Sequence, residues 1–397
     1  MTVIWKPMLD ANATKWQALA DQLGRDRFAP LAAEIDREQR YPWETVECFI
    51  KHKFTGLFLP RDYGGEGQSL TTTVAVVETL GTYCASTAAL ICAYQLGAFP
   101  ILLAGTEKQK AFYLREMAEG RATSFALSER VAGSDAAAIE ATATREGDGW
   151  RLRGEKYWIG NGGAARYYVV FAKTDPAAGG RGISAFMVDK EQPGAVIDEL
   201  TDKMGIRGTQ TSNLKLDLVV PDSARVGEVN RALRLALQTL SVGRIMVAAQ
   251  SLGLALAAYR EASRRAVERI AFGHPIIENQ GIGYRLADMV TEISAARMML
   301  YEAARVYDQG GDVSDLGAMT KLMASEVSHR AADAAVQIWG GLGYCKPTIA
   351  ERLYRDQRIL EIYEGASEIQ RLVLARSVRK EVEDQQAAAR ARSKDAK

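Results

Sequence analysis

The sequence contains few residues that bind metals. Of its 397 residues, three are histidine and four are cysteine. The cysteines are scattered, without a CxxC pair or a histidine at ligand spacing, which argues against a zinc site or a disulfide framework. His52, His274 and His329 show no spacing typical of a Ser-His-Asp arrangement. We therefore expect no metal site, and free thiols in a cytoplasmic protein.

An excess of either charge is also missing. Lysine and arginine together number 50 and aspartate and glutamate 49, so the formal net charge is +1. Nucleic acids and membrane surfaces usually require a basic excess, so neither is expected as a main partner. The sequence begins without a basic region followed by an apolar run, and no uninterrupted apolar stretch appears long enough for a bilayer. We expect neither a secretory signal nor a membrane span.

The pattern of polar and apolar residues changes twice along the chain. Residues 1–120 are mostly helix-prone, whereas residues 121–222 alternate polar and apolar positions and carry a hairpin signal at 147–149. Residues 223–380 hold long helix-prone segments typical of a four-helix bundle. Residues 381–397 combine glutamine, alanine and charge without an apolar face, so we expect a tail without regular structure. The predicted class is α+β, mostly α, with three domains.

Two segments of the predicted β-domain have the composition of a ligand site. Residues 125–138 (FALSERVAGSDAAA) run from a strand into a polar turn whose N–H groups and hydroxyls can hold a phosphate or a flat heterocycle. A plain Asx-type turn explains the same residues. In GEKYWIGNGG, Trp158 precedes an Asn-Gly turn and is either a core residue or a side chain against a flat ligand. No P-loop and no Rossmann glycine motif is present, so a nucleotide would be held differently.

Three further segments lie in the predicted bundle. Arg269, in RRAVERIAFGHPI, is either a solvated residue or a donor to a pyrophosphate. The glycine pair in AVQIWGGLGY either ends a helix or allows close approach to a ligand. Glu364 lies in a Tyr-Glu-Gly turn after an apolar run, and a carboxylate with apolar neighbours can act as a base. Glu361 and Glu368 flank it, and a surface position is the alternative for each.

Taken together and in this order, LPRDYGGEGQS, SERVAGSD, GEKYWIGNGG, AFGHPIIENQ, VQIWGGLGY and RDQRILEIYEGASEIQR resemble the acyl-CoA dehydrogenase family. The resemblance extends from about Trp16 to Arg379. It implies an N-terminal helical domain, a middle β-barrel and a C-terminal four-helix bundle, assembled as a homotetramer. It also implies FAD as cofactor, an acyl-CoA substrate and an electron-transfer flavoprotein as acceptor.

The resemblance assigns roles to individual residues. Glu364 corresponds to the catalytic base; some relatives place the base beside the position of Arg244, which here is Gly243. The positions that match flavin-binding residues of the same subunit are Phe125, Leu127, Ser128, Gly133, Ser134, Trp158, Ile159, Gly160, Ala366, Ser367 and Glu368. Those that match contacts from an adjacent subunit are Arg269, Phe272, Gln280, Gln337, Gly340 and Gly341. Those expected at the substrate are Ser134, Arg244, Gly365, Tyr94 and Gln95.

The sequence departs from the family pattern at some of these positions. Gly160 and Ala366 stand where many members carry hydroxyl residues. Tyr94 and Gln95 either line the acyl pocket or face a neighbouring helix; in the first case they predict a short, branched, cyclic or functionalised acyl group. The resemblance implies that Glu364 removes the α-proton while the β-hydride goes to flavin N5. Two alternatives stay open: a flavin oxidase or monooxygenase on the same scaffold, and a dehydrogenase of carrier-protein thioesters.

Overall fold

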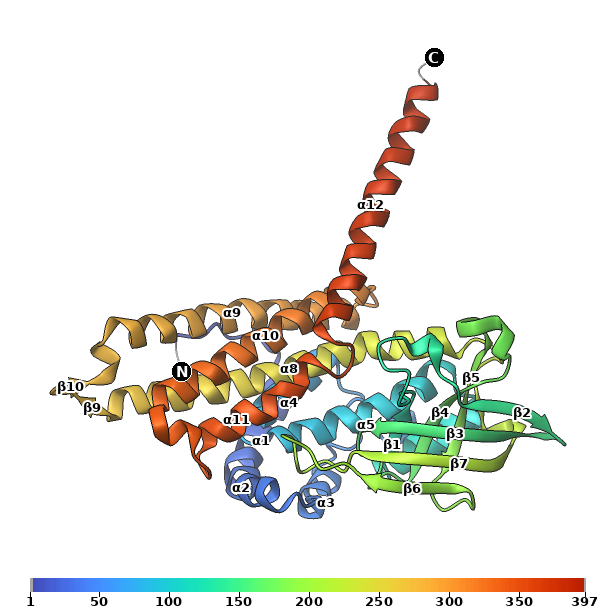
Figure 1. Cartoon of the computed structure of the whole chain (residues 1–397), viewed down its shortest axis with the longest axis horizontal. Helices are drawn as coiled ribbons and strands as arrows, with labels where there is room; N and C mark the ends of the chain where they lie inside the picture. Colours follow the sequence, from blue (N-terminus) through green and yellow to red (C-terminus); the bar gives the residue numbers. More distant parts are fainter. Residues whose placement is uncertain (1–2, 396–397) are drawn as a thin grey trace.

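The computed structural model describes the backbone of residues 3–395, and all side chains within this range except those of residues 199 and 393–395. Along the sequence, a helical region comes first, a sheet region follows, and a second helical region comes last (Figure 1). In space the sheet occupies one end of the molecule, and the long C-terminal helices run from it toward the other end.

The N-terminal region is helical. Two of its helices, α1 and α4, begin where a polar side chain satisfies a free backbone N–H group: Asp10 accepts from Ala13 N, and Ser69 accepts from Thr72 N. The helices are α1 (Ala11–Leu23), α2 (Ala29–Glu38), α3 (Trp43–Lys51), α4 (Leu70–Gly81), α5 (Ala85–Ala104), α6 (Glu107–Gln109) and α7 (Arg115–Ala118).

The middle region is a sheet with strand order β6-β7-β3-β2-β4-β5-β8, in which β1 pairs parallel with β4. The hairpin expected at 147–149 is confirmed, since β2 and β3 pair antiparallel across it. The strands are β1 (Thr123–Ala126), β2 (Thr142–Glu146), β3 (Gly149–Ile159), β4 (Tyr167–Lys173), β5 (Ile183–Asp189), β6 (Ala195–Leu200), β7 (Ser212–Pro221) and β8 (Arg225–Val226).

The expected closed barrel is not confirmed. Within the described residues, β6 pairs only with β7 and the two-residue strand β8 pairs only with β5, so the strand order ends in two edges. Closing a barrel requires hydrogen bonds between the first and last strands. No such pairing between β6 and β8 is found among the described residues.

The C-terminal region contains the longest helices. Helices α8, α9 and α10 pack against one another, and α11 packs against α8 and α10. A small hairpin, β9–β10, lies at the end of α8 that is far from the sheet (Figure 1). The elements are α8 (Ala232–Glu268), β9 (Ile270–Ala271), β10 (His274–Pro275), α9 (Gln280–Asp308), α10 (Ser314–Trp339), α11 (Ile349–Gln357) and α12 (Ser367–Asp395).

Helices α5 and α8 are long and apolar enough to cross a membrane by length and composition, although no stretch of that length was expected from the sequence. In their most apolar windows, however, 67% of α5 and 83% of α8 is buried inside the protein. A helix that is apolar on all sides is usually a core helix when other elements cover it. Both helices are core helices of this fold.

The C-terminal tail differs from its expectation. Helix α12 continues as far as Asp395 and projects from the body of the protein (Figure 1). Its side chains from 378 to 392 are exposed, in accord with the missing apolar face. Glutamine, alanine, arginine and glutamate are good helix formers, and pairs one turn apart such as Arg379–Glu383 support the helix without tertiary contacts.

Buried ionic groups connect the N-terminal region to the bundle. Arg297 on α9 forms two hydrogen bonds of 2.7 and 3.0 Å with the Glu78 carboxylate on α4, and Tyr301 Oη donates to the same carboxylate. All three side chains are buried. Removing one partner of such a pair leaves an uncompensated buried charge, so the contact fixes how α4 lies against α9.

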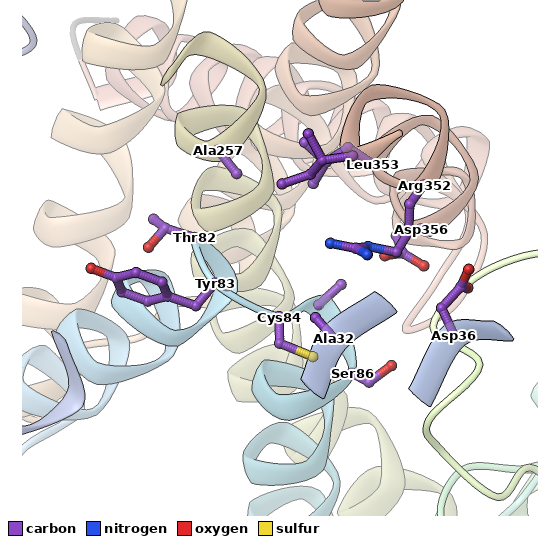
Figure 2. Close-up of a pocket in the computed structure, with 13 residues that line it drawn as sticks. Ala32, Asp36, Thr82, Tyr83, Cys84, Ser86, Ala257, Arg352, Leu353 and Asp356 are labelled. Atoms are coloured by element: carbon purple, nitrogen blue, oxygen red, sulfur yellow. The ribbon is translucent and has the colours of Figure 1, made fainter. Parts of the chain in front are cut away.

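A small cavity lies where α2, the α4–α5 connection, α8 and α11 meet (Figure 2). Asp356 on its α11 side is buried, which raises its pKa to about 6, and it accepts a hydrogen bond from Ile206 N at 2.6 Å. The carboxylate thereby holds the β6–β7 connection against the bundle. None of the residues expected at the cofactor or substrate lines this cavity.

Candidate active site

Glu364 lies in a tight turn immediately before α12. Its φ angle is +52° and that of Gly365 is +92°, so two consecutive residues adopt the left-handed region. Glycine enters this region freely, whereas a residue with a β-carbon pays roughly 1–2 kcal/mol. The Gly365 carbonyl accepts hydrogen bonds from Lys321 Nζ at 2.8 Å and from Gln370 Nε2 at 2.7 Å. These contacts hold a strained turn, as is common at functional sites.

The Glu364 carboxyl group is poised to exchange a proton near neutral pH. Its Oε2 atom is buried and has no hydrogen-bond partner in the described structure. Burial raises its pKa from 4.5 to about 7, because the charged form loses its hydration, while the nearby cations Lys321 and Arg244 oppose that rise. A carboxylate with a pKa near the working pH is suited to act as a general base.

Helices α8 and α5 form the wall beside this carboxyl group. A β-carbon placed on Gly243 of α8 would lie 3.0 Å from Glu364 Oε2 and 3.1 Å from Leu96 Cδ1 of α5. Cys92, one turn before Leu96, lies on the same face of α5 and is close enough for the Glu364 charge to raise its pKa. Arg244 follows Gly243 and is buried with its Nε atom unpartnered.

The structure brings together the two expected flavin segments of the sheet region. Tyr157 N donates to Ser128 O at 2.9 Å, and Ser124 Oγ donates to Gly160 O at 2.9 Å. The loop after β1 is therefore fastened to the end of β3. The members of these segments are partly buried (Phe125, Ser128), buried (Leu127, Ile159) or exposed (Gly133, Ser134, Trp158, Gly160).

A buried ion pair orders the same loop. Lys156 Nζ lies 2.6 Å from Glu129 Oε1 and donates to Leu127 O, and both side chains are almost completely buried. The Glu129 carboxylate also accepts from the backbone N–H groups of Glu140 and Ala141. One carboxylate thus ties both ends of the polar loop to β3.

These residues fit a flavin. A β-carbon on Gly133 or Gly160 would meet no atom within 4 Å, so the backbone is open to close approach there. Trp158, at φ +56°, keeps 55% of its surface exposed, an unusual placement for an indole unless a flat partner covers it. At the start of α12 the Ser367 hydroxyl is buried without a hydrogen-bond partner within the described structure. Ala366 and Glu368 flank it beside the Glu364 turn.

The remaining residues expected at the cofactor lie at the end of the bundle that is far from the sheet. Arg269, Phe272 and Gln280 surround the β9–β10 hairpin and are exposed, Phe272 with 94% of its surface. The end of α10 lies against the last part of α8, because Trp339 Nε1 donates to Glu261 O. This end of α10 carries Gln337, Gly340 and Gly341. These residues form one group, but a single chain does not bring that group to Glu364.

Tyr94 and Gln95, which were expected either at the substrate or against a neighbouring helix, lie in the interior of the protein. The Tyr94 hydroxyl donates to Gly120 O, and the ring is buried in the core of the sheet region. Gln95 is 3% exposed. The partly exposed residues of this stretch are Cys92, Ala93 and Leu96, which occupy another face of α5. Because α5 is apolar all round, its sequence did not show which face turns toward the site.

Three residues near Glu364 were missed in the sequence analysis: Lys321, Leu96 and Cys92. The sequence around Lys321 contains a pattern from which its burial could have been predicted. Lys321 lies on the buried stripe of α10 together with Gly317, Ala324 and Ser328, and it is 0% exposed. A lysine at helical spacing among small core residues is rarely buried without a partner, and such a position suggests a functional contact.

Comparisons with known proteins agree with this arrangement. The family described as acyl-CoA dehydrogenase matches in all three parts: the N-terminal domain over residues 11–121, the middle domain over 124–219 and the C-terminal domain over 230–379. An acyl-CoA dehydrogenase of Bacillus subtilis is 37% identical over 92% of this chain and 98% of its own length.

Two solved structures show the same fold. Butyryl-CoA dehydrogenase from Megasphaera elsdenii has a TM-score of 0.92 at 36% identity, covering 94% of this chain and 100% of that chain. A chain in a structure described as the electron transferring flavoprotein of Acidaminococcus fermentans gives the same TM-score and identity, covering 94% of this chain and 99% of that one.

The fold, the buried carboxyl group of Glu364 and the open loop after β1 together fit an FAD-dependent oxidoreductase, which the comparisons show. More particularly, the three matched domains show that the chain belongs to the acyl-CoA dehydrogenase family.

Proposed function

We propose that the protein removes two hydrogens from an acyl-CoA thioester to give the 2-enoyl-CoA, with Glu364 as the base. The observation that carries this proposal is the buried Glu364 carboxyl group, whose pKa of about 7 allows it to accept a proton near neutrality. The thioester carbonyl acidifies its α-carbon, and the Glu364 carboxylate takes the α-proton. FAD, when bound, supplies the acceptor for the hydride that leaves the β-carbon.

The chain offers a donor for the thioester oxygen. The Glu364 N–H makes no hydrogen bond within the described residues, and a free backbone N–H beside the base can stabilise the charge that develops on that oxygen. Arg244 and Lys321 keep the surroundings of the carboxylate positive, which favours its ionised form. Gly243 leaves room for the carboxyl group, and Leu96 provides apolar surface beside it.

FAD would be held by the loop after β1 and by the end of β3 in the same chain. We propose that the exposed group at the β9–β10 hairpin and the end of α10 contacts the FAD of a second copy within a homotetramer. This is supported by the 94% exposure of Phe272 and by the distance in the fold between this group and Glu364.

The acyl group is proposed to be short, branched, cyclic or functionalised, and an electron-transfer flavoprotein is the proposed acceptor. The similarity to butyryl-CoA dehydrogenase supports the short acyl group, and the similarity to a chain in the Acidaminococcus structure supports the acceptor.

A single anaerobic experiment tests the reaction. The purified FAD-containing protein is mixed with butyryl-CoA and with branched, aromatic and alicyclic acyl-CoA esters, and the loss of the oxidised flavin absorbance is followed. At least one ester should bleach the flavin, and Glu364→Gln should retain FAD but lose the rate by several orders of magnitude. Reduction at the wild-type rate in Glu364→Gln would remove Glu364 as the base. Fast reoxidation by air would favour an oxidase instead.

A further inference from the structure

Lys321 is a buried cation without a carboxylate bound to it. Its side chain is 0% exposed, in the interior of α10, and no salt bridge within 4.0 Å is found for it in the described structure. Its ammonium donates instead to a backbone oxygen, that of Gly365, at 2.8 Å. Burying an ammonium in this way costs free energy that packing alone does not return. We therefore expect a buried lysine at this position to have a functional role.

The Gly365 carbonyl belongs to the strained turn that presents Glu364. Two donors converge on it, the charged Lys321 from α10 and the neutral Gln370 from the first turns of α12. Gln370 Nε2 also reaches the Glu364 carbonyl at 3.3 Å. The left-handed pair at 364 and 365 persists only if its surroundings hold it, and these side chains do so.

The titratable groups that face Glu364 lie on α5, α8 and α10 and in its own turn. Arg244 lies on α8 and Lys321 on α10, and both lower the pKa of Glu364 against the effect of burial. Cys92 on α5 and the neighbouring Tyr363 are neutral, since their pKa values lie above the usual range. Lys321 also faces Glu361 and Glu368. It is therefore one of two cations that stabilise the ionised base.

We propose that Lys321 is a positioning residue for the Glu364 base: its ammonium holds the Glu364–Gly365 turn through the Gly365 carbonyl and supplies positive charge to the carboxylate. The inference rests on the proposed function of Glu364. Lys321 itself does not touch the reacting atoms. Its two contributions, a hydrogen bond and a charge, predict different kinetic effects and can be separated.

The experiment compares three variants of the FAD-containing protein: Lys321→Met, Lys321→Gln and Gln370→Met. Each is mixed anaerobically with butyryl-CoA, or with the ester that reduces the wild type fastest, across the pH range in which the protein is folded. The rate of flavin reduction is recorded at each pH, together with FAD content and the far-ultraviolet circular dichroism spectrum.

Loss of the Lys321 charge should shift the acid limb of the pH–rate profile upward by about one pH unit, because an opposite charge close to a carboxylate lowers its pKa by about that much or more. Lys321→Met should also reduce the rate on the alkaline plateau at least tenfold, since the turn loses a donor. Lys321→Gln retains a donor, so it should show the same shift with a smaller loss on the plateau. Gln370→Met should lower the plateau and leave the acid limb in place.

The outcomes are distinct. An acid limb that stays at the wild-type position in both Lys321 variants, with FAD retained and the plateau unchanged, overturns the inference while Glu364 remains the base. A purely space-filling lysine would change stability and not the acid limb. If Lys321→Met does not fold, Lys321→Gln and Gln370→Met still give the comparison between charge and hydrogen bond. A fully active Glu364→Gln would overturn the proposed function and this inference with it.

Discussion

Gly243 and Glu364 occupy adjoining space: a β-carbon on Gly243 would lie 3.0 Å from the Glu364 Oε2 atom. The two residues are 121 positions apart in the sequence (364 − 243), and α8 brings them together. A glycine in the interior of a helix costs about 1 kcal/mol relative to alanine. Here the absence of a side chain provides the room in which the carboxyl group lies.

Gly243→Ala should therefore separate stability from activity. The methyl group gains helix propensity but presses on Glu364 Oε2 and Leu96 Cδ1, so the carboxyl group must move. We expect the rate of anaerobic flavin reduction to fall roughly tenfold or more, because a small displacement of a catalytic group is costly, with FAD content unchanged. Gly283→Ala on α9, where the added carbon makes only an ordinary contact, is the matched control. Equal rates in the two variants would contradict the role of this space.

The pH dependence of reduction follows from the pKa of Glu364. Since burial raises that pKa to about 7, the ionised base is depleted below that pH, and the reduction rate should rise with pH and level off above it. Stopped-flow measurements with saturating acyl-CoA would show this acid limb of the pH–rate profile. An acid limb close to the ordinary value of 4.5 would mean that the carboxyl group is solvated in the working enzyme.

The same raised pKa has a consequence for stability. The folded protein binds the Glu364 proton more tightly than the unfolded chain does, so this group favours folding at low pH and the benefit is lost as pH rises through about 7. The resulting penalty at alkaline pH is roughly 3 kcal/mol. Glu364→Gln, which carries no charge, should have a higher Tm than the wild type above about pH 8. The difference should shrink below about pH 6, and a constant difference would contradict the assignment.

Breaking the Glu129–Lys156 pair should affect both the fold and the cofactor. Lys156→Met leaves the Glu129 carboxylate buried without its cation, which typically costs about 3–5 kcal/mol. We expect a lower Tm and less FAD retained after dialysis, because the loop after β1 loses its attachment to β3. Glu129→Gln combined with Lys156→Met should recover part of the Tm, since the neutral amide removes the uncompensated charge and its single oxygen can still accept from one of the two N–H groups, that of Glu140 or that of Ala141. A double variant no more stable than Lys156→Met would contradict this explanation.

The resemblance singled out Glu364 as the expected base, and the local sequence agrees with a partly buried position, because a glycine follows Glu364 and an apolar run precedes it. The same holds for Trp158, which the Asn-Gly turn places at the end of a strand. The partner residues could not be found in this way. Lys321 is 43 positions before Glu364 (364 − 321), and only the packing of α10 brings it to the turn.

Two further features could not be specified from the sequence, for a similar physical reason. Tyr94 was expected at the substrate, but α5 is apolar on all sides, so its composition does not distinguish the face toward the site from the face toward the sheet. Closure of the sheet depends on pairing between its first and last strands, β6 and β8, which no local pattern specifies. The tail from residue 381 shows the reverse: its composition lacks a face that could pack, yet favours a helix that needs no packing.

Helix α8 has a mechanical consequence for the whole molecule. Its first turns, with Ala232, Leu235 and Ala236, belong to the apolar core beneath the sheet, and its last turns, with Ala262 and Ala266, belong to the core of the bundle. A continuous helix of 37 residues is about 55 Å long. One continuous helix thus belongs to both regions and connects them. We therefore expect the two regions to lose structure in one cooperative step.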